Sequence, residues 1–160
     1  MAETRTLPNG SKLIYASQED MEYDRLLAAL FEEEDRAREM ASRLMKVAQT
    51  SRDAALAERA ALVTFLCGPM ERHMAYEERN VFPALERRGL GAEVGVAMRH
   101  HAMIREDAEK LAAARPGEDV SQLIFDVARR MLHHTNFEGD YIYPELTYEA
   151  WRDLMKETKG

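Results

Sequence analysis

The chain has 160 residues, a length that suits one domain with one core, and a formal net charge of −7 at pH 7 with its histidines counted as neutral. An acidic chain without a basic cluster argues against nucleic-acid binding, and no apolar run reaches the roughly 20 residues that cross a bilayer. The first ten residues lack the apolar segment of a secretory signal, and a lone cysteine, Cys67, cannot form an internal disulfide, so we expect a cytoplasmic protein.

The predicted secondary structure is helical throughout, because Gly and Pro are sparse and apolar residues recur at helical spacing. Residues 1–20 are expected to be irregular, with a turn at Leu7-Pro8-Asn9-Gly10. Long helices are then predicted over residues 21–50, 54–81, 92–114 and 120–141. Ser51-Arg52-Asp53 is the predicted break and N-cap before the second helix, and a short final helix is expected over residues 148–155.

Four long amphipathic helices with short connections predict an all-α fold, an up-down antiparallel four-helix bundle. We expect a single domain over residues 1–160. Its bundle core would cover about residues 21–146, between an irregular N-terminal segment, 1–20, and a C-terminal tail, 147–160.

Two segments of the chain repeat one motif in register. Each copy has His, an aromatic residue at the third following position, Glu at the fourth, and then aromatic-Pro-x-Leu at the same distance. The first copy begins with His73-x-x-Tyr76-Glu77 and continues to Phe82-Pro83-x-Leu85. The second begins with His134-x-x-Phe137-Glu138 and continues to Tyr143-Pro144-x-Leu146. Residues four apart lie on one helix face, so each copy directs an imidazole and a carboxylate the same way.

These polar pairs continue the apolar stripes of their helices and should therefore face inward, where an ionised Glu is costly unless it is paired or bound to metal. His101 on the third predicted helix and Glu34 on the first share stripes with apolar residues and should face inward too. The predicted metal ligands are three carboxylates and three imidazoles: Glu34, His73, Glu77, His101, His134 and Glu138. Such a set suits iron, manganese or zinc, and because six ligands exceed what one tetrahedral zinc needs, we favour two ions bridged by carboxylates.

Simpler interpretations exist for each residue. A single His-x-x-x-Glu is often an exposed hydrogen bond along a helix, and His101 could be a hydrogen-bonded core histidine. Glu34 could pair with Arg38 on a solvated face, which would leave Glu33 or Asp35 as the ligand. The remaining histidines, His100 and His133, each adjoin a predicted ligand and should point to the surface or to a layer outside the ligands.

The motifs His73-x-x-x-Glu77, His101 and His134-x-x-x-Glu138 resemble, in order and spacing, those of the hemerythrin or HHE cation-binding family over about residues 21–146. That resemblance implies a four-helix bundle with a non-haem di-iron centre that carries an oxo or hydroxo bridge. It implies that Glu77 and Glu138 bridge the irons, that His101 and His134 bind one iron, and that Glu34 and His73 bind the other.

Two positions depart from the family pattern, which usually has His on the first helix where this chain has Glu34. In the oxygen carriers a second His follows the third-helix His by one turn, and here Arg105 stands there. Since an extra carboxylate favours ferric iron, our hypothesis is that Glu34 biases the centre toward redox chemistry over reversible oxygen carriage. The expected partners are oxygen, nitric oxide or peroxide and an external reductant. Alternatives are an iron or oxygen sensor without turnover and a structural zinc site.

Overall fold

The computed structural model of the protein describes residues 18–147 continuously, together with residues 4–6, 8, 10, 12–14, 150, 151 and 154. The helices of the bundle proper are α1 (Gln18–Thr50), α2 (Arg52–Ala57), α3 (Arg59–Phe65), η1 (Leu66–Met70), α4 (Glu71–Tyr76), η2 (Glu77–Val81), α5 (Phe82–Arg87), α6 (Gly91–Ala113) and α7 (Ser121–Tyr141). None of these helices is both long and apolar enough to cross a membrane.

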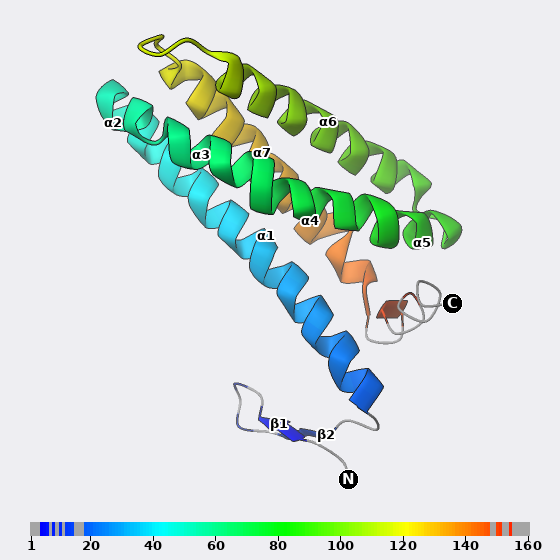
Figure 1. Ribbon diagram of the computed structural model, residues 1–160. Helices are drawn as coiled ribbons and strands as arrows, with labels where there is room; N and C mark the ends of the chain where they lie inside the picture. Colours follow the sequence, from blue (N-terminus) through cyan, green and yellow to red (C-terminus); the bar gives the residue numbers. More distant parts are fainter. Residues whose placement is uncertain are drawn as a thin grey trace.

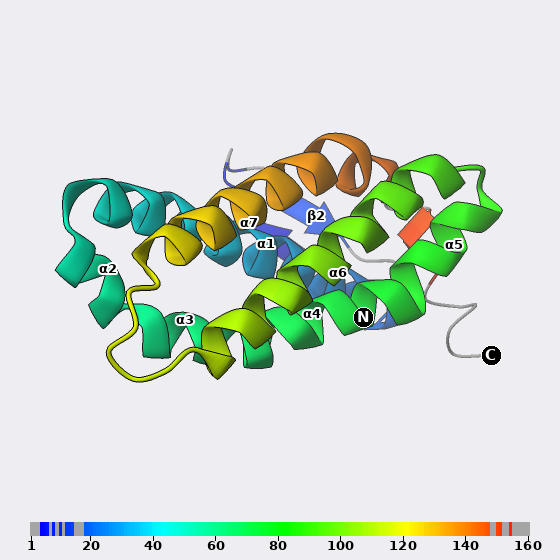
Figure 2. The ribbon, with the colours of Figure 1, turned by 90° about the horizontal axis from the view of Figure 1, so that it is seen from above.

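The helices form four rods that run alternately up and down (Figure 1). Helix α1 is the first rod, the segments from α3 to α5 join end to end as the second, and α6 and α7 are the third and fourth. Helix α1 packs along α7, α7 along α6, and the second rod against α6, as the view from above also shows (Figure 2). The predicted up-down antiparallel four-helix bundle is confirmed.

The helix predicted over residues 54–81 is longer and less regular in the structure, where it is divided between α2 and the segments of the second rod. Ser51 caps α2 as expected, because its hydroxyl accepts a hydrogen bond from the backbone N–H of Ala54 at 3.1 Å. The rod contains two wide π-helical turns, η1 and η2, and it ends at Arg87, not near Val81. Pro83 does not end it. Pro83 directly follows the wide turn η2, and π-helical turns and prolines both bend a helix without ending it.

The N-terminal segment is more ordered than the sequence indicated. Strands β1 (Thr4–Thr6) and β2 (Lys12–Ile14) form an antiparallel pair, with Arg5 opposite Leu13, and α1 already begins at Gln18. The prediction of irregular structure over residues 1–20 is therefore wrong for these strands and the start of α1. Of the predicted turn between the strands, Leu7 and Asn9 lie outside the described residues, and Gly10 has a positive φ of 86°.

Two apolar cores fill the bundle, one toward each end. The first lies around Leu44, Leu66 and Ile124, and the second around Phe82 and Trp151. In the predicted final helix, Ala150, Trp151 and Leu154 are helical and buried, and the rest of residues 148–155 lie outside the described residues. Between the two cores, the chain buries a layer of ionisable side chains that neither core can solvate.

Candidate metal centre

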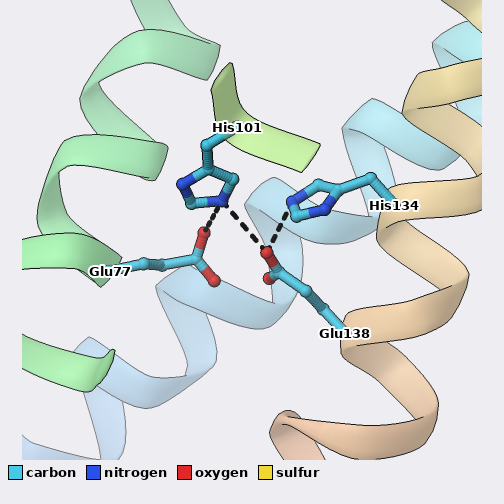
Figure 3. A group of neighbouring side chains, drawn as sticks. All are labelled: Glu77, His101, His134 and Glu138. Atoms are coloured by element: carbon cyan, nitrogen blue, oxygen red, sulfur yellow. Dashed lines mark hydrogen bonds and ion pairs between the residues drawn. The ribbon is translucent and has the colours of Figure 1, made fainter. Parts of the chain in front are cut away.

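The six predicted ligands lie together in this buried layer. Their ligand atoms form two groups, and within each group these atoms lie within 4.8 Å of one another. One group is Glu77, His101, His134 and Glu138; the other is Glu34, His73, Glu77 and Glu138. Figure 3 shows the first group, with Glu77 from η2, His101 from α6 and two residues from α7 directed toward a common point. Glu77 and Glu138 belong to both groups, so they lie between two candidate cation positions.

The distances between these side chains are those of groups that converge on a shared centre. Nε2 of His101 lies 3.4 Å from Oε1 of Glu77 and 3.2 Å from Oε1 of Glu138. On the other side, Nε2 of His73 lies 2.8 Å from Oε1 of Glu34 and 3.3 Å from Oε1 of Glu77. All of these side chains are buried. Three carboxylates in a dry layer repel one another strongly, because little water screens them.

Four of the buried polar atoms have no hydrogen-bond partner among the described residues. They are Glu34 Oε2, Glu77 Oε1, His134 Nε2 and Glu138 Oε2. Although Nε2 of His134 lies only 2.5 Å from Oε1 of Glu138, the two atoms do not meet with hydrogen-bond geometry. Buried polar atoms are normally satisfied, and each exception requires an explanation. A bound cation explains all four, because every one of these atoms can offer a lone pair to it.

Without a cation the protonation states in this layer are strongly perturbed. Burial, followed by the charge of Glu138, raises the pKa of Glu77 well above its usual value, and burial does the same to the pKa of Glu138. Burial and neighbouring positive groups lower the pKa of His101 to about 2, and burial lowers that of His134 to about 4. Both imidazoles are thus neutral at pH 7, which is the form that binds a metal.

His73 differs from the other two histidines. Burial alone would lower its pKa, but hydrogen bonds to Glu33 and Glu34, with the charges of Glu77 and Glu34, raise it to about 10. In the metal-free protein His73 is therefore a cation that partly neutralises the carboxylates. A bound metal would replace the proton at Nε2 of His73, whereas the proton at Nδ1 would stay on the ring and keep its hydrogen bond to Glu33. Metal binding at His73 therefore releases a proton.

A second layer of side chains fixes the direction of the three imidazoles. Nδ1 of His73 donates to Glu33 at 2.5 Å, and Nδ1 of His101 donates to Glu78 at 2.6 Å. For His134 the neighbour is Nδ1 of His100, at 3.1 Å. Metal-binding histidines commonly have such a partner on the ring nitrogen that faces away from the metal. The role of Glu78 could not be predicted from the sequence, because its partner His101 lies on another helix.

Tyr143, the aromatic residue that follows the second His-x-x-x-Glu motif, also enters the centre. Its hydroxyl donates to Oε2 of Glu77 at 3.1 Å and lies 3.4 Å from Nε2 of His73. Burial and the charge of Glu77 raise its pKa well above the usual value, so the phenol stays protonated. At the matching position of the other repeat, Phe82 places its ring 5.3 Å from that of His101. At this position the two halves of the centre therefore differ by one hydroxyl.

The structure distinguishes between the acidic candidates on α1. Glu34 is buried, whereas the side chain of Asp35 is 69% exposed and pairs with Arg38 at 2.8 Å. Glu33 is half-exposed and binds the outer nitrogen of His73. Arg38 has no ion pair with Glu34 among the described contacts, so the solvated-face interpretation of Glu34 does not hold. Of these three carboxylates, Glu34 alone belongs to the cluster.

Arg105, the residue that departs from the oxygen-carrier pattern, points away from the centre. Its guanidinium makes two hydrogen bonds to Glu71, at 2.9 and 3.0 Å, and contacts Glu78 at 2.7 Å. It therefore holds Glu78 against His101 and adds no ligand. The ring centroids of His133 and His100 lie 5.1 Å apart with the rings tilted by 58°, and neither ring joins the two groups described above.

Fold and site together define a helical bundle with a buried cluster of His and Glu side chains that fits a metal site. A family model, the hemerythrin HHE cation binding domain, matches residues 25–146, which is more than half of the chain. The chain therefore belongs to the hemerythrin HHE cation-binding domain family. A search of curated proteins and a search of solved structures gave no significant match.

Proposed function

We propose that the centre holds two iron ions, with Glu77 and Glu138 bridging them. His101 and His134 would complete one site, and Glu34 and His73 the other. The observation that supports this assignment is the division of the cluster into two groups that share only the two glutamates of the repeated motif. Carboxylate and imidazole ligands suit iron, and they also suit manganese and zinc, so metal identity is the first thing to measure.

Bound iron would supply redox chemistry toward oxygen, nitric oxide or peroxide. The side chains of the protein would hold and shield the reacting ligand. Two apolar cores enclose the layer, and the Tyr143 hydroxyl offers a hydrogen bond inside it. A third carboxylate, Glu34, favours the higher charge of ferric iron, so we infer redox chemistry over reversible oxygen carriage. The electrons would come from an external reductant, and we place the protein in the cytoplasm.

Metal analysis of protein purified without added metal tests the assignment. We expect two irons per chain, a number that Glu77→Gln and Glu138→Gln should each lower. Glu32 is exposed on α1, so Glu32→Gln is a matched control that should leave the metal content unchanged. A full complement of iron in both the Glu77→Gln and the Glu138→Gln variant would refute the assignment. Stoichiometric zinc in a colourless protein would show instead that the metal of this centre is structural zinc.

Sensing is the second candidate function, and the position of the centre supports it. The layer joins α1, α6, α7 and the second rod between two separate cores, so metal binding would stabilise the packing of all four rods. A diferrous protein whose absorption changes rapidly with oxygen or peroxide favours redox chemistry. A melting temperature that drops sharply on iron removal, without any such reaction, favours the sensor.

A further inference from the structure

The internal repeat extends beyond the ligands to the residues around them. Positions on α1 correspond to positions on α6, and positions on α4 and η2 correspond to positions on α7. In order, the corresponding pairs are Glu33 with His100, Glu34 with His101, Arg38 with Arg105, His73 with His134, Glu77 with Glu138, and Glu78 with Gly139. The contacts follow this correspondence: Glu33 lies against Nδ1 of His73, and His100 lies in the same way against Nδ1 of His134. Only in the last pair does a polar side chain correspond to a residue without a side chain, because Glu78 corresponds to Gly139.

In the half of the centre that contains His101 and His134, side chains fill the space on the side of the His101 ring that faces away from the cluster. The carboxylate of Glu78 accepts a hydrogen bond from Nδ1 of His101 at 2.6 Å and pairs with Arg105 at 2.7 Å. Arg105 is held in place by Glu71 as well. The imidazole is thus covered by an ion-paired layer that separates it from solvent.

In the half that contains Glu34, the same space is open. Gly139 supplies no side chain, and Arg38 turns instead to Asp35 at 2.8 Å, Asn136 Oδ1 at 3.3 Å and the carbonyl of Thr135 at 3.3 Å. A cavity of about 300 Å³ remains, lined by Phe31, Glu34, Asp35, Arg38, Gly139, Tyr143 and Pro144. A Cβ atom at Gly139 would lie 3.4 Å from Arg38 Nη2, at the edge of this cavity.

The glycine and the unusual ligand are physically linked. A histidine ligand needs an acceptor for its outer nitrogen, which Glu78 provides for His101. Glu34 is a carboxylate without any such N–H, so no acceptor is needed at position 139. A glutamate ligand in place of a histidine therefore allows Gly at position 139, and Glu34 and Gly139 line the same cavity.

We propose that the cavity beside Gly139 is the route by which hydrogen peroxide reaches the Glu34 side of the centre, and that Gly139 keeps this route open. This proposal rests on the proposed function. The cavity has donors, in the Arg38 guanidinium and the Tyr143 hydroxyl, and acceptors, in the carboxylates of Glu34 and Asp35. Hydrogen peroxide both donates and accepts hydrogen bonds and is neutral, which suits a lining with more carboxylates than guanidinium groups. Oxygen and nitric oxide gain little from such a lining.

The test fills the cavity without touching a ligand. Gly139→Gln copies the shape of Glu78 in the other half without adding a charge, and Gly139→Leu fills the space with apolar atoms. The matched controls are Gly95→Gln and Gly95→Leu on α6, where a Cβ would meet only Arg99 Nη1, at 3.9 Å. Iron content and melting temperature are measured first for all proteins.

Stopped-flow absorption then follows the mixing of the diferrous protein with hydrogen peroxide. Each ferrous ion gives one electron, and one hydrogen peroxide is reduced to two hydroxide ions. We expect both Gly139 variants to hold two irons and to react roughly 10-fold or more slowly than wild type, with the Gly95 controls unchanged. Azide binding to the diferric protein is a readout without turnover, and its rate should fall in parallel.

Three results would overturn the proposal. Wild-type rates in iron-loaded Gly139 variants would exclude this route and leave the proposed function intact. Loss of iron in both Gly139 variants but not in the controls would show that Gly139 serves the structure of the centre, not access to it. A wild-type protein without iron, or one inert to hydrogen peroxide, would remove the chemistry that the route serves.

Discussion

Glu34→His combined with Gly139→Glu should give the open half of the centre the same outer layer as the closed half. In the closed half, Glu78 accepts from His101 at 2.6 Å and pairs with Arg105 at 2.7 Å. In the double variant the introduced carboxylate would accept from the introduced imidazole and from Arg38, whose Nη2 would lie 3.4 Å from a Cβ atom at position 139. The two substitutions should therefore stabilise each other.

The magnitude follows from the cost of each single substitution. Glu34→His alone places an imidazole N–H without an acceptor where the present side chain is 4% exposed, which costs about 1–3 kcal/mol. Gly139→Glu alone brings a fourth carboxylate toward Glu34. The double variant removes both penalties and makes a charge-assisted hydrogen bond. We expect a coupling free energy of about 2 kcal/mol, roughly a 30-fold change in the unfolding equilibrium.

Urea unfolding of the metal-free wild type, the two single variants and the double variant gives this coupling as a double-mutant cycle. Glu34→His with Gly95→Glu is the control, and its coupling should be close to zero because Gly95 lies outside the cavity. Additivity within about 0.5 kcal/mol for the Gly139 pair would refute the inferred correspondence between the two halves.

Three further predictions concern the metal-free protein and the hydroxyl of the centre. Glu77→Gln should stabilise the metal-free protein by about 2 kcal/mol at pH 7 in urea unfolding while lowering its iron content, because a neutral amide replaces a carboxylate whose pKa is raised by burial; equal or lower stability would contradict this. The pKa of His73 is raised to about 10, so its ion pairs stabilise the metal-free protein fully below pH 6.5, and this stability is lost as the pH rises to about 10. Melting temperatures across that range should fall, and Glu33→Gln should make the fall smaller. Tyr143→Phe should lower the free energy of unfolding by about 1 kcal/mol and, in protein loaded with the two proposed irons, make their Mössbauer signals more alike, since it removes the hydroxyl that Phe82 lacks; unchanged spectra would argue against that asymmetry.

The sequence by itself predicted the four helices and the polar positions on their inward faces. The reason is that the i, i+4 spacing places His73 with Glu77, and His134 with Glu138, on one helix face whatever the surroundings are. The repetition of that spacing in two segments also indicated a centre built by two related halves. Both predictions depend only on geometry within one helix.

Tertiary structure decided which neighbours those faces meet. The rotation of α1 about its axis, set by the packing of two apolar cores, buries Glu34 and leaves Asp35 in solvent. The partnership of His101 with Glu78 and the open space beside Gly139 join residues from different rods, so no spacing along the chain could reveal them. Periodicity determines the face on which a side chain lies, but only the packing of the helices determines what that face contacts.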